Sequence, residues 1–465
     1  MTMKTTKTLV LACGLALASV MARAQEVSPV DFMRMNPFQM NSNPAADMPY
    51  RSVMSLVVGN INVSLMNTGL HYDNFFDFDA QGKPTALNLR KLASGLKENN
   101  FLGFNDKENF FTLYRQLNTG MLTVGWDLNV QGDMKFNDGL FNLLAYGNSA
   151  FLGEDNPAKV AMDLNVTAYQ QFSVGYQLNV DQLSVGGRAK LLFGFANVDT
   201  QSLEAQVFTD PETYALRLQE KVDARASLPG VFAVEDGMLV TRGAFSPGDL
   251  FSNPGFAVDL GAEYRFNDQF GAVAAVHDLG FISWGANNFS LKSNIVDAGQ
   301  YYENDSFLFN GVDLKALQMI TTSDDYLTHY LDTLRQYFQV DFENTSRYAT
   351  MMNTNLLLRG YYNLDNQNRV SAQVQGTFLR SGFRPALTLA YSGTFNSMFD
   401  VCATYTMMKD SYANIGLGLA GNFGTFHIYA TTNNLLGLFN PLNTKYFHAQ
   451  FGIVFNMRKS RSFSY

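Results

Sequence analysis

A long alternation between apolar and polar side chains is the feature that most restricts the fold of this chain. In the segment 160–178, apolar residues occupy positions 160, 162, 164, 166, 168, 172, 174, 176 and 178. Successive side chains of a β-strand point to opposite faces, so the segment is predicted to be a strand with one apolar face. It is long for a soluble sheet, whereas a tilted membrane crossing takes about 9 to 11 residues. The pattern therefore favours a transmembrane β-barrel over a soluble sandwich.

The same alternation returns in four consecutive C-terminal segments, 352–362, 372–378, 387–395 and 401–407. The short connections between them, such as 365–368 and 409–411, are rich in turn-forming residues, so neighbouring strands are predicted to be antiparallel. Further strands are predicted at 121–131, 183–195, 256–266, 415–419 and 447–455. In the first strand the apolar parity changes across Gly59 and Asn60, which predicts a β-bulge.

The number of strands is restricted because single-chain bacterial barrels have an even number. The alternation marks about fifteen segments. Either a segment near Val231 to Val240 adds a strand and makes sixteen, or one segment is not a strand and the barrel has fourteen. We predict an all-β fold, an antiparallel transmembrane barrel of about fourteen strands, with helical segments in long extracellular loops.

The N-terminal residues have the pattern of a secretory signal. Lys4 and Lys7 precede an apolar run from Leu9 to Met21, and Ala22-Arg23-Ala24 forms an A-x-A cleavage site. The run is too short to cross a bilayer as a helix. We expect residues 1–24 to be a signal peptide and residues 25–49 a periplasmic segment able to plug a barrel. Residues 50–465 are expected to form a barrel in the cell outer membrane, with long loops at 68–108 and 295–349.

Composition and motifs exclude several classes of protein. Charged residues are 16% of the chain against about 25% in typical soluble domains, and the net charge of −8 argues against nucleic acid as a partner. None of the five histidines lies in a hydrolase or metal-binding motif, and His427 is predicted to be an ordinary lumen residue. We therefore expect no enzyme activity, no metal and no cofactor. Cys402 is predicted to point into the barrel.

Ionisable side chains on the predicted inner faces are the candidate site residues. An Arg or Lys on the lipid face would cost about 2 to 4 kcal/mol near the membrane midplane, so parity favours an inward orientation. Opposite charges could pair and brace a filled barrel, or they could line a polar path for a solute. The candidates are Asp127, Asp163, Arg188, Lys190, Asp259, Glu263, Arg265 and Arg359.

Two loop segments have helical rather than strand spacing. In the first long loop, Leu89, Leu92 and Leu96 fall on one helical face. In the acidic insertion 295–349, the same spacing places Leu327, Leu331, Leu334 and Phe338 on one face. Such helices would either cover the barrel mouth or receive a partner, because long loops are often functional.

Short motifs along the chain resemble those of a large family of uncharacterised outer-membrane barrels from the Bacteroidota, a domain of unknown function. The motifs, in order, are Asn43-Pro44-Ala45, Gly69 to Phe76, Gly147-Asn148, Asp259 to Ala262, Asp278 to Trp284 and Thr432 to Leu436. That family is similar in turn to the long-chain fatty-acid transporters and to the shuttle protein of the type IX secretion system. The resemblance implies a barrel of roughly fourteen strands, with an N-terminal segment that plugs the lumen as in the transporters. The insertion 295–349 departs from the transporter pattern.

Two functions are compatible with these observations. The first is a transport barrel for small or amphipathic solutes, and the alternative is a binding or scaffold barrel in surface assembly or protein secretion. The expected partners are outer-membrane lipid and lipopolysaccharide, a small amphipathic ligand, or a surface or secretion protein. A hydrophobic pocket that reaches a gap in the wall would favour transport. A plugged lumen with an exposed apolar loop patch would favour the scaffold.

Overall fold

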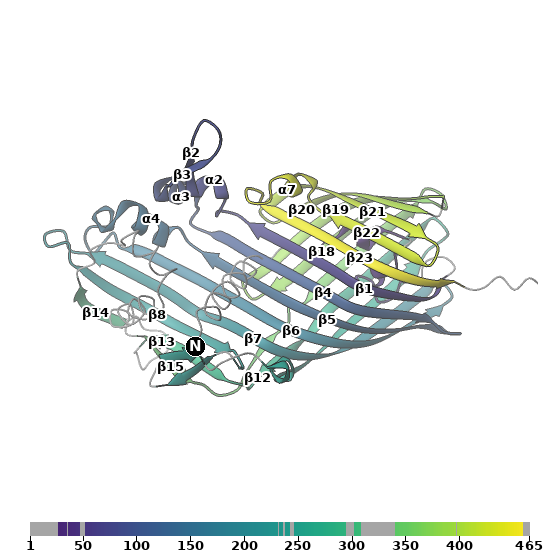
Figure 1. Ribbon diagram of the computed structural model, residues 1–465, viewed down its shortest axis with the longest axis horizontal. Helices are drawn as coiled ribbons and strands as arrows, with labels where there is room; N and C mark the ends of the chain where they lie inside the picture. Colours follow the sequence, from purple (N-terminus) through teal and green to yellow (C-terminus); the bar gives the residue numbers. More distant parts are fainter. Residues whose placement is uncertain are drawn as a thin grey trace, which may run out of the picture.

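The computed structural model describes residues 27–34, 36–46, 52–230, 232–235, 238–241, 246–293, 302–307, 340–396 and 398–458. Within these residues, fourteen antiparallel strands close into a barrel (Figure 1). Closure occurs where β1 pairs with β23 on one side and with β4 on the other. The predicted fold class and strand number are confirmed. In order around the barrel, the strands are β1 (Ser52–Asn67), β4 (Asn100–Gln116), β5 (Gly120–Phe136), β6 (Ala158–Val180), β7 (Leu183–Thr209), β11 (Asn253–Arg265), β12 (Phe270–Trp284), β17 (Asn355–Asn363), β18 (Asn368–Leu379), β19 (Gly382–Phe395), β20 (Phe399–Met408), β21 (Ser411–Phe423), β22 (Phe426–Thr432) and β23 (Tyr446–Arg458).

The two ends of the barrel differ. Ser52 pairs with Arg458 at one end, here called the terminal end, and the short turns after β4, β6, β11, β17, β19 and β21 also lie there. The opposite end, here called the loop end, carries the connections 68–99, 137–157 and 433–445 and the described residues of the connection after β12, which are 285–293, 302–307 and 340–354.

On one side of the loop end, the β-sheet that forms the barrel wall extends beyond the closed barrel. β6 and β7 have 23 and 27 residues, and the part of β7 beyond Gly194 pairs with β8 (Leu216–Ser227) instead of β11. β8 pairs in turn with β13 (Asn288–Ser293) and β14 (Tyr302–Phe307), as Figure 1 shows. β15 (Val340–Asn344) pairs with β13, and β16 (Tyr348–Met351) pairs with β12.

Short helices and a β-hairpin lie in the connections at the loop end. The first loop holds α2 (Tyr72–Phe75), the hairpin β2 (Phe76–Phe78) and β3 (Pro84–Leu87), and α3 (Leu89–Gly95), and this hairpin projects away from the barrel (Figure 1). α4 (Gly139–Tyr146) and η3 (Asn148–Ala150) follow β5, η4 (Pro247–Phe251) precedes β11, and α7 (Leu435–Phe439) follows β22. No helix in the described part of the chain is both long and apolar enough to cross a membrane.

The helical spacing predicted at Leu89, Leu92 and Leu96 corresponds to α3, in which Leu92 is buried and after which Leu96 is buried too. The helix predicted around Leu327 to Phe338 lies outside the described residues. The bulge predicted at Gly59 is present, because the pairing of β1 with β23 shifts between Val58 and Ile61 and Gly59 has a φ of 64°.

Of the two alternatives for the strand number, fourteen is confirmed, because the described residues near Val231 to Val240 form the hairpin β9 (Phe232–Glu235) and β10 (Met238–Thr241), whose strands pair only with each other and add none to the barrel. Two sequence predictions need correction. β4 begins at Asn100, inside the predicted loop 68–108, since a charged run at 106–108 hides its alternation. The predicted strand 352–362 begins only at Asn355, so Met352 lies between β16 and β17 and packs in a buried cluster and not on the apolar face.

The outside of the barrel is apolar and the inside is polar, the reverse of a soluble protein. Leu356, Leu358 and Leu389 are exposed on the outer face, while Gln373, Gln375 and Thr388 are buried inside. Exposed aromatic side chains also gather near both ends of the strands, as in membrane barrels, whose apolar band is about 25 Å tall. At the terminal end these are Tyr264, Phe266, Phe270, Phe395, Phe399, Phe423, Phe426 and Phe455, and at the loop end they are Phe256, Phe281, Phe378, Phe383, Tyr405 and Tyr412.

The turn between β17 and β18 shows how a terminal-end turn is stabilised. The Asp365 carboxylate accepts hydrogen bonds from the backbone N–H groups of Gln367 and Asn368 and from the Asn368 side chain. These bonds lower the pKa of Asp365 below its usual value. Their contribution to the turn is therefore present above the unfolded-state pKa and is lost as the pH falls through the lowered value.

Labelling from the bilayer tests the strand register. Cys402 is fully buried on the inner face, so it should not react with a bulky lipid-soluble maleimide in liposomes. In a Cys402→Ala background, Leu358→Cys should react rapidly, because Leu358 is 62% exposed on the outer face. Mass spectrometry of the labelled protein gives both yields. Fast labelling of Cys402 together with an inert residue 358 would contradict the register.

Candidate functional site

A segment that belongs to no sheet lies buried against the inner faces of the strands. It contains two short helices, η1 (Pro29–Phe32) and η2 (Pro37–Asn41). Each begins at a polar residue followed by proline, and the Ser28 and Asn36 side chains accept hydrogen bonds from the backbone N–H groups of Val30 and Phe38. Apolar side chains of the segment pack into one buried cluster with side chains of β1, β4, β20, β21, β22 and β23. We call residues 27–46 the inner segment.

One half of the inner segment lies against β21, β22 and β23. Ser28 Oγ donates to Gln450 Oε1 at 2.5 Å and lies 3.1 Å from Thr431 Oγ1. A Cβ at Gly418 would lie 2.9 Å from Met33 Sδ and 3.1 Å from Pro29 Cβ, so the segment sits directly on this glycine. At the terminal end, Arg34 donates to the carbonyl of Asn366.

The other half lies against β7 and β11. Asn43 Nδ2 donates to Glu263 Oε2 at 2.9 Å, and Asn43 Oδ1 accepts from the backbone N–H of Ala45. A Cβ at Gly186 would lie 1.9 Å from the Pro44 carbonyl oxygen, and one at Gly261 would lie 2.9 Å from Pro44 Cδ. Only glycine lets the Asn-Pro-Ala turn approach the wall this closely.

A buried ion cluster on β7, β11 and β12 lies partly on the same strands that carry Gly186 and Gly261. Lys190 Nζ is 2.7 Å from Asp259 Oδ1 and 2.6 Å from Asp278 Oδ1. Arg188 and His277 each lie 3.6 Å from Asp259 Oδ2. The backbone N–H of Asp278, at a φ of 56°, donates to Asp259 Oδ1. Asp259 is completely buried, so the positive groups of Arg188 and Lys190 and the Asp278 N–H compensate a charge that would otherwise be very costly.

Side chains of the barrel strands also bond backbone carbonyl groups of the inner segment. Arg188 Nη2 donates to the Met40 carbonyl, and His277 Nε2 bonds the Ser42 carbonyl at 3.0 Å. Arg359 Nη1 donates to the Asp31 carbonyl at 2.8 Å, and its guanidinium lies 4.5 Å from the centre of the Phe32 ring. The barrel strands therefore hold the inner segment both by its backbone and by polar side chains such as Ser28 and Asn43.

The predicted site residues separate into groups. Arg188, Lys190 and Asp259 meet in the ion cluster, while Glu263 and Arg359 contact the inner segment directly. Arg265 donates to Ser184 Oγ near Glu263. Asp127 is buried elsewhere and accepts from Asn109 and Gln171, and Asp163 is half-buried near the loop end, where it accepts from Asn165.

Sequence reasoning missed two members of the ion cluster, His277 and Asp278. The sequence signal was the pair His277-Asp278, which interrupts an otherwise apolar stretch. The structure gives Asp278 a positive φ, which is typical of a bulge. Among the described residues, no group of three or more His, Cys, Asp or Glu side chains could hold a metal ion.

Several buried polar atoms on the inner faces have no hydrogen-bond partner in the protein. They include Ser64 Oγ, Asn129 Nδ2, Thr377 Oγ1, Ser392 Oγ and both ring nitrogens of His427. An unpaired buried polar group costs about 1 to 3 kcal/mol. A surface with many such atoms is suited to water or to a polar solute and not to a dry core.

The wall is incomplete where β22 ends. β22 stops at Thr432, so residues 411–416 of β21 and 446–449 of β23 have no β22 partner. Asn433 fills this place: its Oδ1 accepts from Thr404 and Thr406, and its N–H donates to His448 Nδ1. Outside this point lies an apolar pocket of about 470 Å³, here called the wall pocket, with Ile61, Val63, Leu417, Leu419, Leu435, Leu438 and Phe451 among its lining residues.

Substitution of Gly186 tests how the inner segment is held. In Gly186→Ala the new Cβ meets backbone atoms of Pro44, so residues 43–46 should shift, and the amide hydrogens of Asn43, Ala45 and Ala46 should exchange faster. Gly360→Ala is the matched control, since a Cβ there has no neighbour within 4 Å. Hydrogen exchange with mass spectrometry compares the two. Equal protection of residues 43–46 in both variants would contradict the described contact.

Known proteins were compared with this chain, and curated proteins gave no match. Solved structures that are similar include the toluene transporter TodX of Pseudomonas putida, with 9% identity, a TM-score of 0.41 and coverage of 93% of this chain and 98% of that one. The toluene transporter TbuX of Ralstonia pickettii has 10% identity, a TM-score of 0.42 and coverage of 92% and 95%. A FadL homologue of Pseudomonas aeruginosa has 11% identity, a TM-score of 0.40 and coverage of 94% and 97%.

A family match covers most of the chain. The family described as "Family of unknown function (DUF5723)" matches residues 44–433. The matched range includes the Asn-Pro-Ala turn from Pro44 onward, the ion cluster and the end of β22 at Asn433. The chain therefore belongs to the family of unknown function DUF5723.

Proposed function

We propose that this protein is a transport barrel of the outer membrane for small or amphipathic solutes, in which the inner segment acts as a plug. One observation carries the proposal. A lumen whose unpartnered polar atoms favour water or a polar solute is occupied by a segment that belongs to no strand pairing. The loop end faces the outside of the cell and the terminal end faces the periplasm.

Removal of the plug would leave the barrel intact. The fourteen strands pair with one another without any contribution from residues 27–46. A hydrogen bond from a charged donor contributes about 1.5 to 3 kcal/mol, and burial of each large apolar side chain contributes about 1.5 to 3 kcal/mol. The plug is therefore held firmly, and a solute opens it by replacing the contacts made by groups such as Arg188, His277 and Arg359.

The wall pocket supports amphipathic solutes over purely polar ones. The polar side chains of Asn433, Thr404 and His448 lie inside the barrel at the end of β22. The apolar side chains of the wall pocket lie on the outer face at the same level of the wall. A solute with a polar and an apolar part can interact with both surfaces at this point.

A second candidate function is a scaffold barrel that binds a surface or secretion protein. The observation that favours it is an exposed apolar patch on the last loop, where Leu436, Phe439 and Leu442 are 68%, 81% and 60% exposed. Such patches often mark interaction sites. This function requires a lumen that stays closed, whereas transport requires one that opens.

Conductance measurements separate the two functions. Deletion of residues 27–46 should spare assembly and produce a barrel with a steady, open conductance in a planar lipid bilayer, because the remaining inner face is polar. The full chain should be closed most of the time. A peptide of residues 25–46 added to the deletion variant should restore closure, and a scrambled peptide should not. A deletion variant that assembles but conducts no better than the full chain would overturn transport and favour the scaffold.

Surface labelling tests the proposed orientation. In the Cys402→Ala background, Gln81→Cys in the exposed first loop should react with a membrane-impermeant maleimide on intact cells. Asn366→Cys, in the exposed turn between β17 and β18, should react only after the outer membrane is opened. The reverse pattern would invert the topology.

A further inference from the structure

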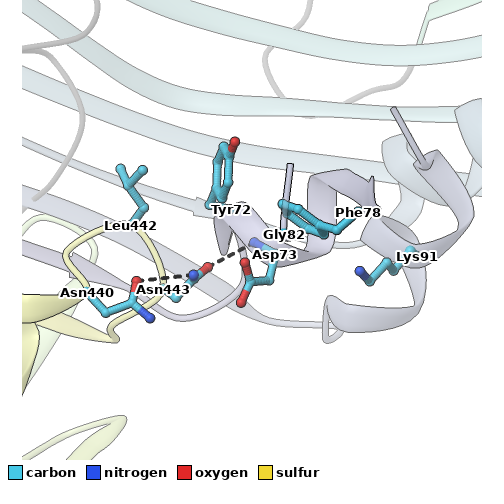
Figure 2. Close-up of a pocket in the computed structure, with 8 residues that line it drawn as sticks. All are labelled: Tyr72, Asp73, Phe78, Gly82, Lys91, Asn440, Leu442 and Asn443. Atoms are coloured by element: carbon cyan, nitrogen blue, oxygen red, sulfur yellow. Dashed lines mark hydrogen bonds between the residues drawn. The ribbon is translucent and has the colours of Figure 1, made fainter. Parts of the chain in front are cut away.

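A second pocket, of about 580 Å³, lies at the loop end between the first loop and the last loop (Figure 2). The two loops are joined there by hydrogen bonds. The N–H of Tyr72 donates to the Leu442 carbonyl at 3.1 Å, and the N–H of Asp73 donates to Asn443 Oδ1 at 2.9 Å. Asn443 Nδ2 in turn donates to Asn440 Oδ1. We call this the loop pocket, lined by Tyr72, Asp73, Phe78, Gly82, Lys91, Asn440, Leu442 and Asn443.

The charges around the loop pocket select against a strongly charged ligand. Lys91 Nζ lies 5.4 Å from the centre of the Phe78 ring and donates to the Phe76 carbonyl, so it is already engaged and repels a cation at that ring. The exposed Asp73 carboxylate repels an anion. A neutral ligand meets neither repulsion.

The remaining groups of the loop pocket suit a hydroxyl-rich ligand with an apolar face. The Tyr72 and Phe78 rings lie 5.8 Å apart at an angle of 58° and offer apolar ring surface. The Asp73 carboxylate is an acceptor, the Asn440 Nδ2 is a donor and the Tyr72 hydroxyl can serve as either. A sugar ring combines an apolar C–H face with hydroxyl groups that both donate and accept hydrogen bonds. Its C–H face can therefore pack on the two aromatic rings, and its hydroxyl groups can bond the polar groups of the pocket.

The loop pocket and the wall pocket are neighbours on the same loop. Leu438 lines the wall pocket and Asn440 lines the loop pocket. Two residues of chain span at most about 7 Å, so one molecule can reach both. Leu436 and Phe439 of α7, next to these residues in the chain, are 68% and 81% exposed and add apolar surface beside the pockets.

We propose that the two pockets together bind one neutral membrane glycolipid, with its sugar in the loop pocket and an acyl chain along α7 in the wall pocket. The occupant is a lipid and not a free sugar, because the wall pocket opens on the lipid-facing side beside Ile61, Val63 and Phe451. In a membrane, apolar surface exposed on the outer face of the strands meets acyl chains. The inference does not require that the barrel transports a solute.

Native mass spectrometry of the full chain in lipid nanodiscs tests the proposal. The discs contain equal amounts of monogalactosyl diacylglycerol and phosphatidylethanolamine, and the lipids retained after release are counted by mass. The wild-type chain should retain the galactolipid over phosphatidylethanolamine by about tenfold. Phe78→Ala, in the loop pocket, and Leu438→Ser, in the wall pocket, should each reduce this preference to near unity.

Tyr412→Ala is the matched control, since Tyr412 is an exposed aromatic residue of the loop end that lines neither pocket. It should retain the galactolipid as the wild type does, and heat-modified gel mobility should show all variants folded, because Phe78 and Leu438 lie outside the barrel strands.

Three outcomes would overturn the proposal. Equal or greater retention of phosphatidylethanolamine would assign the pockets to a zwitterionic lipid, whose two charges match Asp73 and Lys91. Binding of methyl galactoside as tight as that of the galactolipid would reduce the site to one for free sugar. Loss of retention in Tyr412→Ala equal to that in Phe78→Ala would show that retention does not involve the loop pocket.

Discussion

Closure of the backbone hydrogen-bond ladder is the constraint on which the rest of this structure depends. A strand in hydrocarbon cannot leave its N–H and C=O groups unpaired, so a transmembrane sheet has no free edge. Here β23 returns to β1, and β1 pairs along most of its length with both β23 and β4. Once the sheet is closed, one face of each strand must be apolar toward lipid, and the other face is left to enclose a lumen.

The polar and charged side chains that point into this lumen need partners, and the inner segment and the ion cluster supply many of them. Inward polar groups need partners, and a buried charge without one would be very costly. Asp259 obtains its partners from β7 and β12, where Arg188, Lys190 and His277 converge on it. Arg188 and His277 also bond the carbonyl groups of the inner segment, so the same residues brace the wall and hold what lies across it.

The early end of β22 is the main departure from this regular ladder. Backbone carbonyl groups of β23 beyond the end of β22 are instead bonded by side chains: Thr432 Oγ1 donates to the His448 carbonyl, and Asn434 Nδ2 donates to the Tyr446 carbonyl. Asn434 also accepts from Gly437 and begins α7. Residues 432–434 therefore end the pairing of β22 with its neighbours and begin the apolar helix α7. This helix lies between the wall pocket and the loop pocket in the chain.

The sequence by itself determined which residues form most strands and which side of each strand meets lipid, because alternation with a period of two is a local property of the chain. It also determined the bulge at Gly59, the helix at Leu89 and the inward position of Cys402. Only the tertiary structure decided that Pro44 rests on Gly186 and Gly261, that Asp278 joins Asp259, and that Tyr72 and Asn443 line one pocket. Those contacts join residues far apart in the chain or on different strands, and the closure and stagger of the whole barrel set the distances between them.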